Sequence, residues 1–159
     1  MNESQESNTQ QKAVASDALF GLTVAIDFDG TCVTHEYPKV GRYIGAQPVL
    51  QRIVAEGGKL ILWTMRSDQG LQDAVDWFEA HGIPLYGIQR NPTQDEWTNS
   101  PKCYAKLYID DAALGCPLLP GLKGERPFVD WKAISEIFGR TQKPICGRKI
   151  KAYENKTTK

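Results

Sequence analysis

Residues 24–31 read V-A-I-D-F-D-G-T, an apolar run that ends in two aspartates, a glycine and a threonine. The run continues a short β-branched segment, residues 22–26, which has the composition of a buried parallel strand. Asp27 and Asp29 follow this strand at its carboxyl end, and Gly30 supplies the backbone freedom for a tight turn after them. We therefore expect the turn to point both carboxylates at one centre.

Helix-like and strand-like segments alternate along the rest of the chain. Apolar side chains recur at helical spacing in three segments: residues 48–56, 71–82 and 130–138. Three further segments read as buried strands: residues 59–66, 83–88 and 105–111. Asp130 is the expected N-cap of the last helix, and residues 112–127, broken by Gly and Pro, read as loop. The alternation predicts an α/β fold, three-layer and Rossmann-like, with a mostly parallel sheet and no large cap domain.

The composition fits one soluble domain with a polar segment at each end. Of 159 residues, 41% are hydrophobic and 24% charged, which suits a single globular core and no membrane span. We expect a disordered lead at 1–17, a catalytic domain at 18–139 and a basic tail at 140–159, where seven Lys or Arg against Glu154 give +6. The N-terminus lacks the basic start and apolar middle of a secretory signal, so we expect a cytoplasmic protein.

Polar residues gather at the expected carboxyl ends of the strands, where open parallel sheets bind their ligands. Thr64 and Arg66 follow the second predicted strand, and Asp110 with Asp111 follows the fourth. Carboxylates that converge at one edge repel one another unless a hard cation lies among them, and oxygen ligands favour Mg²⁺. The sequence therefore predicts a magnesium site at this edge of the sheet.

A cation beside Asp27 allows its carboxylate to attack phosphorus as a nucleophile. Asp29 is then placed as a general acid for the leaving oxygen and a general base for water. The hydroxyl of Thr64, a lysine and the backbone amides of residues 28–31 offer donors for the phosphoryl oxygens. These residues predict a phosphomonoester hydrolase that works through an aspartyl-phosphate.

Over roughly residues 20–138, the chain resembles the haloacid dehalogenase-like superfamily, which has four motifs in a fixed order. Here they are D-F-D-G-T, then Thr64 at the end of its strand, a lysine before the fourth strand, and finally Asp110-Asp111. The segments I-D-F-D-G-T-C-V-T-H-E-Y-P, L-I-L-W-T-M-R and Y-I-D-D-A-A-L-G-C-P are similar to a small capless subgroup of bacterial and phage phosphatases. The resemblance implies Mg²⁺ held by Asp27, the backbone carbonyl of Asp29, Asp110 and Asp111, with phosphate bound by Thr64, a lysine, Gly30 and Thr31.

Some assignments stay open at this point. Lys102 and Lys106 both precede the fourth strand, and we prefer Lys102 because it follows a loop whereas Lys106 begins the strand. His35 and Tyr37 lie where the superfamily places its flap, and with Arg66 they are candidates for substrate contact. The alternative is that all three are ordinary surface residues.

The function also has alternatives. A haloacid dehalogenase-like fold can serve as a non-catalytic phosphate-binding or interaction module. A phosphotransferase or phosphomutase is a further alternative, because it differs from a hydrolase only in the group that accepts the phosphate. The order of the acids excludes a receiver domain, which has an acidic pair early and a single acceptor Asp on a later strand. Here the D-x-D comes first and the D-D comes last. Without a cap, the open site admits a phosphorylated small molecule or a nucleic-acid end as substrate. Alternatively, the subunits of a homo-oligomer can cover the site. The basic tail is suited to contact with a polyanion.

Overall fold

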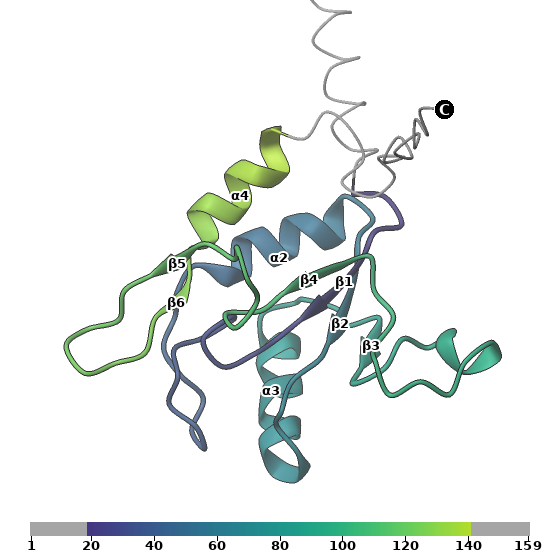
Figure 1. The fold of residues 1–159 in the computed structure, drawn as a ribbon, viewed down its shortest axis with the longest axis horizontal. Helices are drawn as coiled ribbons and strands as arrows, with labels where there is room; N and C mark the ends of the chain where they lie inside the picture. The colour runs from purple at the N-terminus through teal and green to yellow at the C-terminus, as the bar shows by residue number, and fades with distance from the viewer. Residues whose placement is uncertain (1–18, 141–159) are drawn as a thin grey trace, which may run out of the picture.

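A four-stranded parallel sheet forms the centre of the computed structural model, which describes residues 19–140 (Figure 1). The predicted lead at 1–17 and, beyond its first residue, the predicted basic tail at 140–159 lie outside the described residues. The strand order is β3-β2-β1-β4. The strands are β1 (Thr23–Ile26), β2 (Lys59–Leu62), β3 (Gly87–Ile88) and β4 (Leu107–Ile109). The predicted α/β fold with a parallel sheet and no large cap is confirmed.

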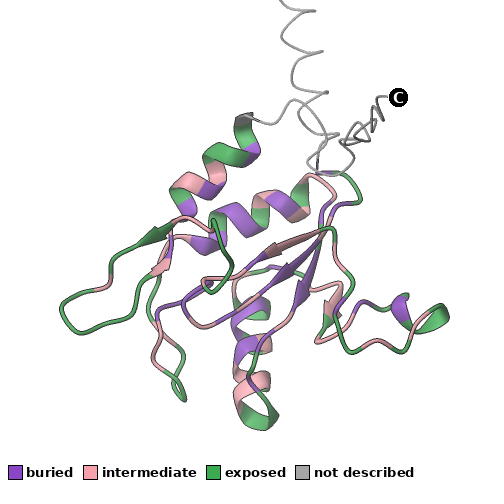
Figure 2. Cartoon of the chain, in the orientation of Figure 1, coloured by how far each residue is buried: buried purple, intermediate pink, exposed green. Residues whose placement is uncertain are grey.

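Three α-helices pack against one face of this sheet. They are α2 (Ala46–Ala55), α3 (Asp68–Ala80) and α4 (Trp131–Arg140). Val24 and Ile26 of β1 meet Leu50 of α2 and Phe78 of α3 in the main hydrophobic cluster, where each of these four side chains is at most 1% exposed. Figure 2 shows the buried residues on the strands and along the inner side of the helices. Burial of this apolar surface is the main stabilising term of the fold.

The opposite face of the sheet is covered differently. Each right-handed crossover from β1 to β2 and from β2 to β3 advances in the same direction, so α2 and α3 lie on the same face. The return from β3 to β4 passes the other face, and its residues 89–106 contain only the short 3₁₀ turn η1 (Gln94–Glu96). Ala25, Ile61 and Cys103 form a separate small cluster there. In the described residues, the third layer is thus built from loop rather than from α-helix.

Local signals explain most of the element ends. The Oδ1 atom of Asp130 accepts hydrogen bonds from the amides of Lys132 and Ala133 at 3.0 and 3.1 Å, as expected of an N-cap. Helix α2 begins at Ala46, two residues before the predicted start, and places Pro48 in the first turn, where its missing N–H costs nothing. Helix α4 passes Gly139 and includes Arg140.

The prediction that residues 112–127 are loop throughout was wrong. This segment contains β5 (Leu118–Leu119), which pairs antiparallel with β6 (Phe128–Val129). Leu118 and Leu119 are both 42% exposed, so this strand has no buried face and leaves no apolar alternation in the sequence. No described helix is long and apolar enough to cross a membrane.

Candidate active site

Three carboxylates converge at the carboxyl edge of the sheet. Asp27 follows β1, and Asp110 and Asp111 follow β4, the neighbouring strand. One carboxylate oxygen from each residue lies within 4.8 Å of the others. This oxygen-only donor set suits a hard divalent cation. The predicted convergence of these three residues is present in the structure.

The position of Asp27 disfavours its ionised form in the absence of a cation. Burial, together with the smaller effect of the charges of Asp110 and Asp111, raises the pKa of Asp27 from 3.8 to about 7, although hydrogen bonds from the Phe28 amide and the Thr31 hydroxyl oppose the rise. A nearby positive charge would reverse this electrostatic balance and favour the carboxylate. The strong perturbation marks Asp27 as a functional candidate on physical grounds.

Thr31 lies beneath the carboxylates and is fully buried. Its hydroxyl donates a hydrogen bond to Asp27 Oδ2 at 2.9 Å and accepts one from the Asp111 amide at 3.1 Å. Its carbonyl oxygen accepts a bond of 2.6 Å from Trp131 Nε1, which comes from α4. Because its hydroxyl is committed in this way, we assign the Thr31 side chain to joining the two acidic loops rather than to binding phosphate.

Gly30 fixes the shape of the turn. It has a φ of +81°, and a Cβ atom built on it would lie 2.0 Å from His35 Nε2, so no other residue fits there without displacing the histidine. The amides of Gly30 and Thr31 donate to Val33 and Phe28 carbonyls. Of the predicted amide donors at 28–31, the Phe28 amide bonds to the Asp27 carboxylate, and the Asp29 amide is left for an oxyanion.

Asp29 lies outside the carboxylate cluster and pairs with Arg66 instead. Arg66 Nε and Nη2 donate to the two oxygens of Asp29, each at 2.7 Å. The Arg66 side chain is only 1% exposed, and it also donates to the carbonyls of Pro38 and Lys39. The hydrogen bonds to Asp29 raise the pKa of this guanidinium above its ordinary value. The expectation that Arg66 contacts phosphate or substrate directly does not fit this buried, fully engaged position.

Thr64 follows β2 and lies at the site, 8% exposed. Its hydroxyl accepts a hydrogen bond from the Arg66 amide at 3.2 Å, so its proton stays available to an oxyanion. Gln89 holds the Thr64 backbone on both sides: Oε1 accepts from the Thr64 amide at 2.9 Å, and Nε2 donates to the Thr64 carbonyl at 2.6 Å. Gln89 adopts a φ of +58°, and no local sequence signal predicts this left-handed conformation.

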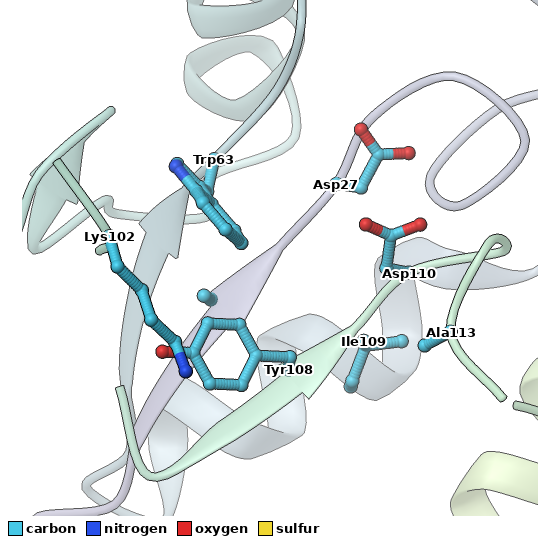
Figure 3. A pocket seen from close by; sticks show the side chains of 8 residues that line it. Asp27, Trp63, Lys102, Tyr108, Ile109, Asp110 and Ala113 are labelled. Atoms are coloured by element: carbon cyan, nitrogen blue, oxygen red, sulfur yellow. The ribbon is translucent and has the colours of Figure 1, made fainter. Parts of the chain in front are cut away.

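Lys102 lines a cavity that extends to two of the acidic residues, whereas Lys106 does not line it. A cavity of about 250 Å³ on the face of the sheet without helices is lined by Lys102, Trp63 and Tyr108, and by Asp27 and Asp110 at its end. Figure 3 shows the two carboxylates together, with the Lys102 amino group beside the Tyr108 ring, 5.6 Å from its centre. The Lys106 amide bonds to Thr23, at the opposite end of β1. Between the two predicted alternatives, the placement favours Lys102.

The second, larger cavity at the site measures about 500 Å³. Asp27 and Asp110 line it too, together with Asp29 and three residues on its rim: His35, Tyr37 and Arg126. His35 Nε2 lies 2.9 Å from Asp111 Oδ2, and Tyr37 is 66% exposed. The predicted flap residues His35 and Tyr37 therefore do reach the site. Arg126, just before β6, was not predicted, because nothing in its local sequence separates it from a surface arginine.

Comparison with known proteins finds a relative among the solved structures. A solved structure of a conserved protein from Bacteroides thetaiotaomicron has 32% sequence identity and a TM-score of 0.62, over 75% of this chain and 90% of that one. The chain belongs to the family of this conserved protein. No protein-family model matches the chain.

A more distant relative bears the name of a phosphatase. The type II inositol polyphosphate 5-phosphatase 15 of Arabidopsis thaliana is 26% identical over 130 residues, which take in 70% of this chain. The match spans only 12% of the plant protein. The name therefore describes a protein of which the matched segment is only a small part.

Proposed function

We propose that the chain is a haloacid dehalogenase-like phosphomonoester hydrolase that depends on Mg²⁺ and forms an aspartyl-phosphate on Asp27. The observation that carries the proposal is the convergence of Asp27, Asp110 and Asp111 within 4.8 Å, beside an Asp29 that is held separately. Two aspartates from one turn thereby have different surroundings, as a nucleophile and an acid/base require. The phosphatase name of the plant relative agrees with this class of reaction.

The residues of the site fit a divalent cation. Three oxygen donors from two neighbouring loops face one point, and burial, together with the charges of Asp110 and Asp111, raises the pKa of Asp27 there. Asp27, Asp110 and Asp111 would hold Mg²⁺, with the backbone carbonyl of Asp29 as a further ligand implied by the resemblance. When bound, the cation would keep Asp27 ionised and neutralise phosphate charge.

The chain's own groups then account for each step of the proposed reaction. The Asp27 carboxylate attacks phosphorus, a P–O bond to Asp27 forms, and the P–O bond to the leaving group breaks. Asp29 gives its proton to the departing oxygen and afterwards takes one from the water that attacks the aspartyl-phosphate, releasing inorganic phosphate. The Thr64 hydroxyl, the Asp29 amide and Lys102 donate to the phosphoryl oxygens.

The test is hydrolysis of p-nitrophenyl phosphate by the full chain with and without Mg²⁺. We expect release of phosphate that needs the cation and falls by about 10³-fold or more in Asp27→Asn. Asp76→Asn, which alters an exposed acid on α3, is the matched control and should keep full activity. Two results would overturn the mechanism. One is activity that survives in Asp27→Asn, and the other is a protein-bound phosphate that is stable to acid and attached only to hydroxyl side chains.

The second candidate is a binding module of the same fold without turnover. Its specific support is the Asp29–Arg66 pair, which engages both oxygens of the proposed acid/base. Mg²⁺ and phosphate binding by calorimetry, combined with no hydrolysis across nucleotides, sugar phosphates and 3′-phosphate oligonucleotides, would select it.

A further inference from the structure

The two cavities at the site share Asp27 and Asp110 but differ in everything else that lines them. The smaller one is lined by Lys102 with Trp63 and Tyr108, and the larger one is lined by Asp29. In phosphoryl transfer, the attacking and leaving oxygens lie roughly in line on opposite sides of phosphorus. If Asp29 protonates the leaving oxygen, as the proposed function requires, the leaving group occupies the larger cavity. That cavity, of about 500 Å³, is roomy enough for a group beyond the phosphate.

Two guanidinium groups line this larger cavity, and they differ in how far they are engaged. The Arg66 side chain is 1% exposed and gives two bonds of 2.7 Å to Asp29 and a third to the Lys39 carbonyl. Arg126 has a 69% exposed side chain, and its Nη2 lies 3.7 Å from Asp111 Oδ2, beyond hydrogen-bond distance. A solvated ion pair at this separation is weak. The Arg126 guanidinium therefore keeps donors available for an anion in the cavity.

The backbone around Arg126 is held in place by bonds from two other parts of the chain. The neighbouring Glu125 accepts a bond of 2.7 Å from Arg42 Nη2, and Arg42 Nε donates to Glu36 at 2.9 Å. After Arg126, the Val129 amide bonds to the Gly30 carbonyl at 2.9 Å, which ties β6 to the catalytic turn. These contacts hold Arg126 at the cavity, which the exposed Met65 and Tyr37 also line with apolar surface.

We propose that Arg126 is a specificity residue that binds a second anionic group, a carboxylate or a second phosphate, on the leaving group of the substrate. The inference rests on the proposed function, because it takes the larger cavity as the leaving-group side. A guanidinium binds either kind of oxyanion through two parallel N–H donors, which a lysine cannot do. The preferred substrates are then phosphomonoesters with a second negative charge a short distance from the ester oxygen.

The test compares matched aryl phosphates: phenyl phosphate, 3- and 4-carboxyphenyl phosphate, and their carboxamide analogues. In the wild-type protein, at least one carboxylated ester should have a kcat/KM about tenfold above that of its carboxamide, and Arg126→Ala should remove this preference. Arg126→Lys should restore only part of it. Lys123→Ala, an exposed cation in the same loop that does not line the cavity, should leave the preference intact.

A binding measurement makes the test independent of turnover. Titration of Mg²⁺-loaded protein with phenylphosphonate, 4-carboxyphenylphosphonate and 1,4-phenylene bisphosphonate should show tighter binding of a dianionic ligand, lost in Arg126→Ala. The last two ligands distinguish a carboxylate from a second phosphate as the preferred group. Equal effects of Arg126→Ala on charged and neutral ligands would overturn the inference, even if the esters are hydrolysed. Absence of hydrolysis with an intact Arg126-dependent preference would overturn the proposed function instead.

Discussion

The guanidinium of Arg66 meets the carboxylate of Asp29 edge to edge, with Nε and Nη2 each 2.7 Å from one of its two oxygens. The rings of Phe28 and Tyr37 lie 5.0 and 5.2 Å from the guanidinium carbon, so the group is enclosed by aromatic side chains as well. This parallel pairing fixes the plane of the Asp29 carboxylate. It makes Arg66 a positioning residue for the proposed acid/base.

Replacing Arg66 with Ala should lower the free energy of unfolding by about 3 kcal/mol or more, because it leaves Asp29 unpaired. Arg66→Lys should cost about 2 kcal/mol, since an ammonium group cannot donate to both oxygens in parallel. Urea denaturation monitored by tryptophan fluorescence measures both losses. Arg52→Ala, which breaks the solvated Arg52–Glu56 pair on α2, is the control and should cost less than about 1 kcal/mol. Losses of equal size in Arg66→Ala and Arg52→Ala would show that the pair contributes no more than a surface contact.

Much of the fold was predictable because local patterns and the global architecture agree. The apolar run before Asp27 forms a strand whose Val24 and Ile26 are buried, and Asp130 caps the last helix as its position suggested. The acids at 110 and 111 meet Asp27 because parallel strands end at one edge of the sheet. Strand direction alone determines that convergence, so no knowledge of side-chain packing was needed.

The partners of individual side chains were not predictable in the same way. Arg66 and Asp29 are 37 positions apart, and the sequence shows only that both lie near strand ends. Gln89 and Gln94 read as ordinary loop residues, yet each organises the backbone of a site loop. Their roles depend on loop paths that no periodicity encodes. The exposed strand β5 was missed for a related reason, since it buries neither face.

Asp27→Asn should stabilise the metal-free protein at high pH. With its pKa raised from 3.8 to about 7, chiefly by burial, Asp27 keeps in the folded state a proton that the unfolded chain releases between these values. The unfolded state then binds fewer protons, so stability falls as pH rises from about 4 to 7 and stays lower above that. The asparagine carries no charge and still accepts the Thr31 hydrogen bond. In a chelating buffer at pH 8, the variant should melt about 4 °C or more above wild type.

The pH dependence provides the control for this effect. At pH 4 the unfolded chain keeps about half of its Asp27 protons, so most of the advantage of Asp27→Asn should disappear. Saturating Mg²⁺ at pH 8 should also reduce the difference in melting temperature between Asp27→Asn and wild type, because a cation stabilises the wild-type carboxylate. A variant that melts above wild type by the same margin at pH 4 and pH 8 would show that charge is not the cause.

Asp110→Asn should weaken Mg²⁺ binding while leaving the fold intact. Asp110 Oδ1 accepts a bond of 2.8 Å from the Ala112 amide, which an asparagine oxygen can keep, but one of the three converging negative charges is lost. We expect the affinity for Mg²⁺ to fall by about tenfold or more, and the rise in melting temperature on adding Mg²⁺ to shrink accordingly. Calorimetric titration gives the affinity directly. Unchanged affinity in Asp110→Asn, with Asp76→Asn as the reference, would remove Asp110 from the ligand set.

Replacing Gln94 tests whether the loop at residues 94–104 contributes to phosphate binding or only to stability. It is fully buried in η1, where Nε2 donates to the carbonyls of Ser100 and Lys102 at 2.9 and 2.8 Å and Oε1 accepts from the Tyr104 amide at 2.7 Å. Gln94→Leu keeps the volume but leaves the Lys102 carbonyl and the Tyr104 amide without partners, whereas the Ser100 carbonyl keeps its bond from Arg90. This loss should cost about 3 kcal/mol of stability.

Because these bonds place Lys102 beside the site, Gln94→Leu should also raise KM for phosphate esters several-fold, and kcat should change less. Gln72→Leu, at an exposed position on α3, is the control for the same substitution. Steady-state kinetics at saturating Mg²⁺, with urea denaturation of the same samples, measures both effects. A variant that loses stability but keeps its KM would show that residues 94–104 cover the face of the sheet without contributing to phosphate binding.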